Sequence, residues 1–532
     1  MAALDGFSEN PASKWSVALG VLTVLAVGVG VVLYTLRRKE LLGSSLEDFI
    51  TARNTSGPLA IGWSMFASAV GSWVILTPAP FGSFGGIITA LTYGVATAIP
   101  LLFIGFWGTS IRKQFPDVLS FSDFARKQFG VVTQVMVVLI SLLNMAIFAT
   151  AEYTGVYTLF STYVGMGDSA AAIVLILAFT TLGYTTYGGL RVSILTDQLQ
   201  GSAALLLTVV AAITLAATFS KESVEESLEG TNFTPSFEVN EFVTGAYVVG
   251  YSTMFTLPLS LTCATIFSEA WWARAWAATD EKALKKGALF GAVITFLVVT
   301  FWGMVGVLVA WSGIPAPDFN LVAFYPFLLD RDSLLVDSGI AVLMVLLATI
   351  MAEGVIDSLM NGIGASVSGA LDSYLTEEQA KKHSLSIGRA CVVVLNIPII
   401  IVSLQQYDIL SLFLLGNMIT ICCFFPLFLG FFPNVQFLQR NMSDWIFPVN
   451  FVGSLIILAV YGAIDFGSVG EGLKFAFWLN ANYEYEYFLV AILGTVFWTG
   501  ILLVISEVFG LGNEKASMEV VDAKVAEKTD DI

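Results

Sequence analysis

The chain has 532 residues, of which 56% are hydrophobic and only 12% are charged, and its formal net charge is −17. A soluble domain carries about 25% charged residues, so this chain lacks the polar surface that a water-exposed globule of its size needs. The composition therefore excludes a soluble enzyme and a disordered scaffold, and the negative charge argues further against a nucleic-acid partner. What remains is an all-α polytopic membrane protein.

Apolar runs between polar breaks predict thirteen membrane-spanning helices, since a helix needs about 20 mostly apolar residues to cross the bilayer core. The run at 337–372 is too long for one crossing and is expected to continue into the cytosol. The predicted spans are 15–36, 57–79, 84–111, 131–163, 170–187, 191–218, 242–268, 287–312, 337–372, 388–406, 408–432, 444–464 and 485–508.

The Lys and Arg residues predict the orientation, because basic residues favour the cytosolic side of a membrane. With the N-terminus outside, 20 of the 24 basic residues fall in inner segments or at the inner ends of spans, and none lies in the interior of a predicted span, where it could neutralise an acid. The four outer ones are Lys14, Lys221, Arg331 and Lys474. We therefore expect a multi-pass protein of the plasma membrane, with its N-terminus outside and its C-terminus in the cytosol.

Two polar segments lie between or after the spans. The outer loop at 219–241 is acidic and contains a glycosylation sequon at Asn232. The tail at 509–532 has mixed charge and few aromatic residues, and it is expected to be disordered in the cytosol.

The sequence offers no pattern for a resident metal or cofactor. The single histidine, His383, is expected in a solvated loop, so a Ser-His-Asp triad cannot form. No Cys/His ligand spacing occurs, and the thiols are interpreted as small buried hydrophobic groups. The cysteines are Cys263, Cys391, Cys422 and Cys423.

Four acids fall inside predicted spans: Glu152, Asp197, Glu353 and Asp357. A charge at the bilayer centre costs about 2.5–3.5 kcal/mol on the insertion scale, so such an acid usually faces a cavity, a partner or an ion. With no basic partner expected, the remaining solutions are a bound cation, a proton or an acid kept neutral. The alternatives are a helix cap for Asp197, a protonated packing residue for Glu152, and a water-filled vestibule for the other two.

Two predicted spans contain helix-breaking residues at membrane depth. The first has small and hydroxyl residues around Gly71, and the second has Gly250 followed by Pro258. The two spans lie five helices apart. A repeat of five helices crosses the membrane an odd number of times, so the second repeat begins on the opposite side and is inverted relative to the first. Interrupted helices at matching positions of two inverted halves indicate a transporter binding site.

Several motifs resemble those of a known family. The stretch YTTYGGLR at 184–191, followed by TDQLQ at 196–200, resembles the signature of the sodium:solute symporter family. Segments at 47–53, 274–288 and 408–415 also resemble this family, the second of them its cytosolic loop after the sixth core helix. The resemblance covers roughly residues 45–430.

The resemblance implies the leucine-transporter-type fold, with a 5+5 inverted-repeat core, one leading helix and two trailing helices. The implied divisions are an extracellular N-terminus with the leading helix at 1–44, the first repeat at 45–218, the extracellular acidic loop at 219–241, the second repeat at 242–432, the trailing helices at 433–508 and the cytosolic tail at 509–532.

The resemblance also implies a cation site at the break of the first core helix, with main-chain carbonyl ligands at Ala67 and Val70. The acid of the TD motif corresponds to Asp197, and oxygen ligands of these kinds suit a hard cation. In the family, two adjacent serines complete the site, and Asp357 and Ser358 lie at or next to those positions here. A carboxylate in place of a hydroxyl leaves both sodium and a proton open as the coupling ion.

A solute pocket is expected beside the same break. The candidate pocket residues are Ser68, Ser72, Trp73, Glu152 and Tyr251. The two aromatic residues among them can equally be packing or lipid-facing side chains.

The sugar-binding pattern of the family does not carry over to this chain. Sugar-transporting members place Asn, Tyr and Trp late in the sixth core helix, whereas this chain has Leu261, Cys263, Ala264 and Thr265 there. Hexose is therefore not the expected solute.

The sequence as a whole predicts a secondary active transporter that couples a cation, sodium or proton, to the symport of a small polar solute. Urea, an amino acid, a polyamine and a small carboxylate remain open. The alternatives are a passive channel or facilitator for the same solute and a non-transporting solute sensor on a transporter fold. An enzyme is not expected, and the expected partners are the solute, the cation and the lipid bilayer, with the oligomeric state open.

Overall fold

The computed structural model describes residues 11–38, 45–230, 232–246, 248–314, 319–328, 334–372, 374–379, 383–432, 435–477 and 485–512. Within these ranges the chain is helical and has no strand, apart from one isolated bridge between Ser56 and Ala278. The all-α prediction is therefore confirmed. Of the tail predicted at 509–532, residues 513–532 lie outside the described residues.

Eleven long helices build the body of the described part of the molecule. They are α2 (Pro11–Arg37), α6 (Pro78–Gln114), α8 (Val131–Thr158), α9 (Ala171–Thr218), α12 (Val248–Ile266), α14 (Glu281–Ser312), α15 (Leu334–Asp372), α17 (Leu385–Ser403), α18 (Ile409–Leu429), α20 (Ile446–Phe466) and α22 (Tyr485–Phe509).

Shorter elements connect or interrupt these helices. They are α3 (Leu46–Thr51), α4 (Pro58–Ala69), α5 (Trp73–Leu76), α7 (Phe121–Gln128), η2 (Leu159–Tyr163), η3 (Gly167–Ala170), α10 (Lys221–Leu228), α11 (Glu241–Thr244), α13 (Glu269–Ala277), η4 (Phe319–Leu328), α16 (Glu377–Gln379), α19 (Gln436–Asn441) and α21 (Val469–Phe477).

Ten helices among the described residues are long and apolar enough to cross a membrane. One of them, Gly167–Thr218, bends at Gly189 and thus joins the two spans predicted at 170–187 and 191–218. The spans predicted at 57–79 and 242–268 fall on interrupted helices outside these ten. The chain is therefore a multi-pass membrane protein, and the count of thirteen crossings stays a prediction.

The bend in α9 depends on Gly189, which has φ 65° and ψ −164°. A side chain is strained at this φ, and a Cβ there would lie 2.7 Å from the carbonyl oxygen of Phe49. Only glycine accommodates both the backbone conformation and the close approach of α3.

Gly189→Ala is expected to lower the thermal stability of the purified protein. The left-handed backbone alone costs an L-residue about 1–2 kcal/mol, and the contact with Phe49 adds to that cost. Gly183→Ala is the matched control, because it lies in the same helix and a Cβ there meets nothing within 4 Å. Equal melting temperatures for the two variants would show that the bend does not require glycine.

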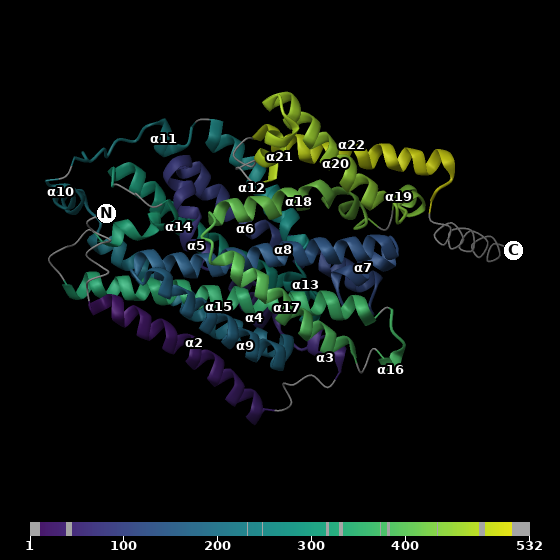
Figure 1. The fold of residues 1–532 in the computed structure, drawn as a ribbon, viewed down its shortest axis with the longest axis horizontal. Coiled ribbons are helices and arrows are strands. Elements are labelled where there is room, and N and C mark those ends of the chain that lie inside the picture. The colour runs from purple at the N-terminus through teal and green to yellow at the C-terminus, as the bar shows by residue number, and fades with distance from the viewer. Residues whose placement is uncertain are drawn as a thin grey trace.

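The long helices run roughly side by side (Figure 1), with α14 packed along α6 and α4, and α15 packed along α9 and α8. The trailing helices α20 and α22 pack on each other at one flank. Helices α10 and α11 lie at the end of the bundle where α2 begins, whereas α3, α7, α16 and α19 lie at the opposite end. The acidic loop and the basic connecting segments are thus at opposite ends of the helices.

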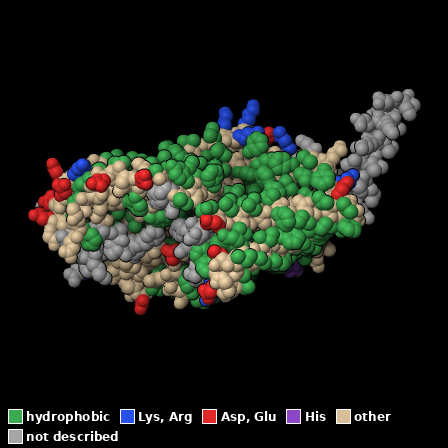
Figure 2. Space-filling view, turned by 90° about the horizontal axis from the view of Figure 1, so that it is seen from above, with side chains coloured by type: hydrophobic (Ala, Val, Ile, Leu, Met, Phe, Trp, Pro, Cys, Tyr) green, Lys and Arg blue, Asp and Glu red, His purple; other side chains and the backbone are tan. Residues whose placement is uncertain are grey.

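Apolar side chains cover much of the face shown in Figure 2, and acidic side chains gather at the end that carries α10. A soluble protein rarely exposes so many large apolar residues, and lipid is the solvent that suits them. Exposed examples on the long helices are Leu22, Val29, Leu139, Phe179, Leu206, Ile213, Phe255, Leu297, Ile464 and Val508.

The predicted break of the first core helix is confirmed. Helix α4 ends at Ala69 and α5 begins at Trp73, so the chain unwinds around Gly71. The three intervening residues are buried.

The predicted break of the second interrupted span is wrong in position. Helix α12 continues through Gly250 and Pro258, and the interruption lies after Ile266, before α13 begins at Glu269. Proline removes one hydrogen bond from a membrane helix, and neighbouring groups can satisfy the freed carbonyl.

The carbonyl oxygens at the real interruption have side-chain donors. Asn144 Nδ2 donates to Ala264 O at 2.9 Å, and Trp272 Nε1 donates to Ile266 O at 2.9 Å. These buried donors come from α8 and α13, so tertiary contacts stabilise the point at which the helix stops.

Candidate functional site

The break between α4 and α5 is held by Glu152 of α8. The backbone N–H and the hydroxyl of Ser72 donate to Glu152 Oε2 at 2.9 and 2.7 Å, and this acid is 1% exposed. A Cβ at Gly71 would lie 2.1 Å from Glu152 Oε1, so glycine allows the carboxyl group to approach the unwound backbone. The carboxyl group thus satisfies an N–H that the interrupted helix leaves free.

A cavity lies beside this break and encloses about 790 Å³ of space, part of it open to solvent. Small-molecule sites commonly combine apolar walls with a few polar groups. The lining residues come from both halves of the chain and are Ser68, Ala69, Trp73, Tyr93, Thr97, Pro100, Phe148, Glu152, Leu257, Leu261, Thr265, Trp271, Val355, Leu359, Leu410, Phe413, Leu414 and Asn417.

Aromatic rings form one part of the cavity wall. The ring centroid of Trp73 lies 5.8 Å from that of Tyr93 and 6.0 Å from that of Phe413, and Phe413 in turn lies 5.1 Å from Phe148. Among the described lining residues, Glu152 is the single acid and no Lys, Arg or His occurs. The cavity therefore combines aromatic faces with one carboxyl group.

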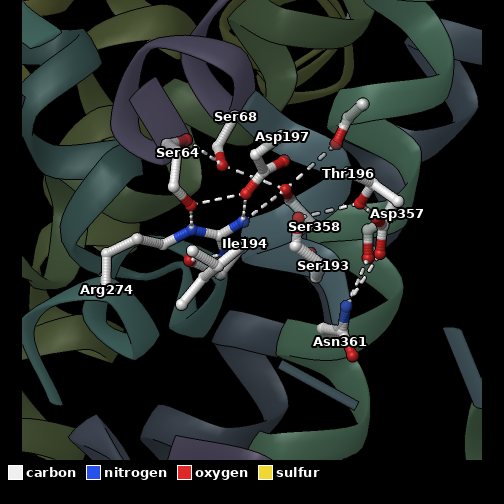
Figure 3. Close-up of polar contacts among 12 residues, drawn as sticks. Ser64, Ser68, Ser193, Ile194, Thr196, Asp197, Arg274, Asp357, Ser358 and Asn361 are labelled. Carbon is white, nitrogen blue, oxygen red and sulfur yellow. Dashed lines mark hydrogen bonds and ion pairs between the residues drawn. The ribbon is translucent and has the colours of Figure 1, made fainter. Parts of the chain in front are cut away.

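A second polar cluster lies around the guanidinium of Arg274, which is fully buried in α13 (Figure 3). Arg274 Nη2 donates to Asp197 Oδ2 at 2.8 Å and to Ser358 Oγ at 2.7 Å, while Nε donates to Ser64 Oγ at 3.0 Å. Ser64 Oγ donates in turn to Asp197 Oδ2 at 2.5 Å. Helices α4, α9, α13 and α15 thus meet at one ion pair.

Two expectations from the sequence are wrong here. Arg274 is not in a solvated cytosolic loop, because α13 is a buried helix with Trp272 and Trp276 on either side of it in sequence. Asp197 is not without a basic partner, since the ion pair with Arg274 joins two side chains that are both 0% exposed. Counting the charges between apolar runs cannot reveal that a short helix such as α13 packs inside the bundle and buries its basic residue.

Asp357 is held by a separate set of neutral donors. Its Oδ1 accepts from Asn361 Nδ2 at 2.8 Å and from Thr185 Oγ1 at 3.2 Å, and its Oδ2 accepts from Thr196 Oγ1 at 2.8 Å. Asp357 is 0% exposed. It is the neighbour of Ser358 in sequence, but the two side chains bind different partners. The carboxyl group is therefore positioned by the bend region of α9.

Residues at the end of α4 line a second, smaller hollow. Ala67 and Val70 line it together with Gln200 and Gly354. Among the described residues, no backbone N–H outside the regular helices donates to the oxygen of Ala67 or of Val70.

The structure thus distributes the predicted cation-site residues over three neighbouring places. Ala67 and Val70 line the smaller hollow, Asp197 and Ser358 bind Arg274, and Asp357 binds hydroxyl and amide donors. All three places involve α9 and α15, and Ser68 of α4 joins the large cavity to one of them.

Ser68 is the link, because it lines the large cavity and its hydroxyl lies 3.0 Å from that of Ser358. Ser358 accepts from Arg274, so a chain of polar contacts runs from the cavity wall to the buried ion pair. Such a chain can transmit a change at one site to the other.

The predicted pocket residues divide into two groups. Ser68, Trp73 and Glu152 line the large cavity, and Ser72 lies behind it as the partner of Glu152. Tyr251 is not brought to the cavity, because it is 51% exposed on α12.

The sequence model of the sodium:solute symporter family matches residues 49–432 of this chain. This chain belongs to the sodium:solute symporter family. It is a cation-coupled solute symporter, as the sequence predicted, and the channel and sensor alternatives are not favoured. Its matched family and similar proteins are transporters.

One relative of this symporter is the spermidine transporter DUR31 of Candida albicans, which is 24% identical over 83% of this chain and 80% of that protein. Among solved structures, a Na+-coupled sialic acid symporter in a substrate-bound outward-open state matches with a TM-score of 0.68 and 14% identity, over 93% of this chain and 98% of that one. Mhp1, a nucleobase-cation-symport-1 family transporter, matches with a TM-score of 0.48 and 15% identity, over 90% and 98% of the two chains. The first structural likeness shows the shared fold.

Sequence reasoning missed several polar residues of this symporter. Arg274 is the largest omission, and its signal was a lone basic residue between alanines and tryptophans in EAWWARAWA. Gln200, at the end of the TD motif, and Asn361, one turn after Asp357, had no signal beyond their polarity in apolar helices.

Proposed function

We propose that the solute of this symporter is a small organic cation, such as a polyamine, and that it binds in the large cavity beside the α4–α5 break. The observation that carries this proposal is the lining of the cavity, where Glu152 is the one acid and no described lining residue is basic. A cationic amine would neutralise the acid and remove the cost of an uncompensated charge in the membrane.

The aromatic walls favour the same class of solute. An ammonium group within about 6 Å of an aromatic ring face gains about 0.5–2 kcal/mol, with the larger value in a desolvated site. Trp73, Tyr93 and Phe413 provide such faces around the cavity. A small carboxylate would meet Glu152 with no basic residue to hold it, and urea would leave the acid without a charge partner.

The relationship to a spermidine transporter supports this proposal, because that relative spans most of both chains. A linear polyamine also suits a cavity whose walls are mainly apolar. Its methylene groups would contact the Leu and Val side chains while an amine meets the carboxyl group.

The coupling cation is proposed to be sodium, and its site to lie at the break. Ala67 and Val70 would provide carbonyl oxygens, and Asp197, Asp357 and Ser358 would provide or position side-chain oxygens. Support comes from the position of Ala67 and Val70 at the smaller hollow and from the buried carboxyl groups. A hard cation prefers oxygen ligands of this kind.

The decisive experiment is uptake into proteoliposomes that contain the purified protein. Labelled spermidine, proline, urea and a short carboxylate are offered separately, and sodium and pH gradients are imposed one at a time. The proposal expects accumulation of spermidine, driven by the sodium gradient and abolished by a sodium ionophore. Accumulation of the carboxylate in place of spermidine would contradict the proposal that the cavity binds a cationic solute.

Asp357→Asn is expected to raise the sodium concentration that gives half-maximal uptake by about tenfold or more. The reason is that a buried carboxylate close to a cation contributes about 1.5–3 kcal/mol more than a neutral amide of similar shape. Sodium-dependent uptake is the measurement. Asp465→Asn is the control, because this acid lies exposed on the trailing helix α20. Unchanged uptake with unchanged ion dependence would remove Asp357 from the cation site.

We also propose that the N-terminus is outside, the C-terminus is cytosolic and the protein resides in the plasma membrane. The end of the bundle with α10 is acidic. The opposite end carries α3 and α7, and basic residues in or next to these connecting segments include Arg53, Arg112 and Lys127. Basic residues favour the cytosolic side. Accessibility of a tag inserted at each end, in intact cells, tests this orientation.

A further inference from the structure

Asn417 of α18 is a polar side chain in the wall of the large cavity that the proposed function has not used. It is 2% exposed, and its Oδ1 has no hydrogen-bond partner among the described residues. The other described residues with which α18 lines the cavity are apolar: Leu410, Phe413 and Leu414. A buried amide oxygen without a partner is costly, so this atom requires a donor.

Contacts between α8 and α18 show at which level of the cavity Asn417 lies. The two helices pack side by side (Figure 1). A Cβ on Gly416 would lie 3.1 Å from Asn144 Oδ1 and 3.5 Å from the ring of Phe148. The ring of Phe148 in turn lies 5.1 Å from that of Phe413, one turn before Asn417. Asn417 therefore lies level with the turn of α8 that begins at Asn144.

Glu152 lies further along the same two helices. It follows Asn144 by two turns of α8. Its partner Ser72 precedes Trp73, whose ring lies 6.0 Å from that of Phe413. Going back from Asn417 to Phe413, α18 therefore approaches Glu152, so the two helices are antiparallel. The carboxyl group and the amide lie at different levels of one cavity.

The separation of the two groups follows from helix geometry. Because an α-helix rises 1.5 Å per residue, the Cα of Glu152 is about 12 Å along α8 from that of Asn144. Each side chain points toward the N-terminus of its own helix, and the helices are antiparallel, so the side chains of Glu152 and Asn417 lean toward each other. Their oxygen atoms are thus about 8–12 Å apart.

One amino group cannot span this separation. An ammonium binds oxygen atoms at about 2.8 Å, so it bridges acceptors that are at most about 6 Å apart. An extended chain of single bonds advances about 1.25 Å per bond, which places the end nitrogens about 6 Å apart in diaminobutane and about 11 Å apart in spermidine. A chain longer than diaminobutane with two amino groups can therefore bind both oxygens at once.

The surroundings of Asn417 also favour a second cation. Asn144 beside it donates to Ala264 O near the C-terminal end of α12, and Thr265 of the same turn lines the cavity. The C-terminus of a helix carries partial negative charge, which attracts a cation. Between the two levels, the rings of Phe148 and Phe413 line the cavity, so a methylene chain would contact apolar walls.

We propose that the cavity binds a linear diamine or polyamine by two of its amino groups, one at Glu152 and one at Asn417, and that Asn417 thereby selects solutes by chain length. This inference rests on the proposed function, because it takes the solute to be an organic cation. It adds a second anchor and a preferred length. A monoamine or a short diamine would reach Glu152 alone.

Displacement of labelled spermidine from the purified full-length protein, in sodium buffer, tests the proposal. The competitors are diaminobutane, diaminooctane and octylamine, which has the chain of diaminooctane without the second amino group. The wild type is expected to bind diaminooctane about tenfold more tightly than octylamine, as one more hydrogen bond to a charged donor implies. Asn417→Leu is expected to abolish this difference and to leave the affinity for diaminobutane unchanged.

Two further variants complete the experiment. Met418→Leu is the matched control, because Met418 is the next residue of α18, is fully buried and does not line the cavity. It is expected to behave as the wild type. Asn417→Gln carries the amide further into the cavity and is expected to shift the preference from diaminooctane toward diaminohexane. This variant provides an independent result if Asn417→Leu does not purify.

Equal affinities of the wild type for octylamine and diaminooctane would overturn the proposal. So would profiles of Asn417→Leu or Asn417→Gln that match the wild type. Glu152→Gln distinguishes this failure from that of the proposed function, since it is expected to weaken diaminobutane and diaminooctane alike. If no amine binds to the wild type, the cationic solute itself is contradicted, and the role of Asn417 with it.

Discussion

Glu152→Gln is expected to weaken the uptake of an organic cation by about 10- to 100-fold, through a higher half-saturation concentration. An interaction with a charged group contributes about 1.5–3 kcal/mol, and 1.4 kcal/mol corresponds to a factor of ten. Initial rates of labelled spermidine uptake into proteoliposomes, across a range of concentrations, provide the measurement. Glutamine has nearly the same shape, so the change removes the charge and leaves the volume of the cavity as it is.

The break itself is expected to survive this substitution. The amide oxygen of glutamine can still accept from the backbone N–H and hydroxyl of Ser72, which now bind Glu152 Oε2. The melting temperature should therefore stay close to that of the wild type. A loss of uptake with preserved stability would separate binding of the solute from support of the unwound helix.

Tyr251→Phe is the matched comparison for this experiment. The sequence placed Tyr251 in the pocket with Glu152, whereas the structure leaves it half-exposed on α12, away from the cavity lining. Its substitution is expected to leave uptake unchanged. If Tyr251→Phe impairs uptake and Glu152→Gln does not, the cavity described above is not the solute site.

Arg274→Met is expected to destabilise the protein by about 3–5 kcal/mol, the usual cost of leaving one partner of a buried ion pair alone. Asp197 would lose its charge partner while remaining fully buried, and Ser64 and Ser358 would lose a donor. The fall in melting temperature of the purified protein reports this cost.

The double variant Arg274→Met with Asp197→Asn is expected to recover much of that loss, because it removes the stranded charge together with its partner. Arg440→Met supplies the control, since Arg440 pairs with Glu507 at the surface, where an ion pair contributes about 0–1 kcal/mol. Equal destabilisation by the single and double variants would mean that Arg274 acts through packing and not through its charge.

The same arginine has consequences for transport. It donates to Ser358, whose hydroxyl contacts that of Ser68 on the wall of the large cavity. Movement of the solute against Ser68 therefore has a direct polar path to Asp197. Coupling requires that cation and solute each raise the affinity of the other, and thermodynamic linkage makes this effect reciprocal.

The sequence by itself determined the class of the protein and much of its framework. Scarcity of charge and the long apolar runs required a membrane-spanning bundle, because only helices and closed barrels satisfy the backbone in lipid. The small residues around Gly71 located the first break, and the predicted spans at 170–187 and 191–218 left between them the segment where α9 bends at Gly189. These features are local in sequence, so the residues concerned are sufficient to predict them.

The tertiary structure alone decided how the buried charges are arranged. Arg274 meets Asp197 across 77 positions of sequence, and Glu152 meets Ser72 across 80. Neither contact leaves a periodic or compositional trace, because pairing depends on how separate helices pack. For the same reason the sequence placed the second break at Gly250 and Pro258, whereas Asn144 and Trp272 stabilise it after Ile266. Charge scarcity identified a membrane protein, and packing decided which of its few charges are partnered.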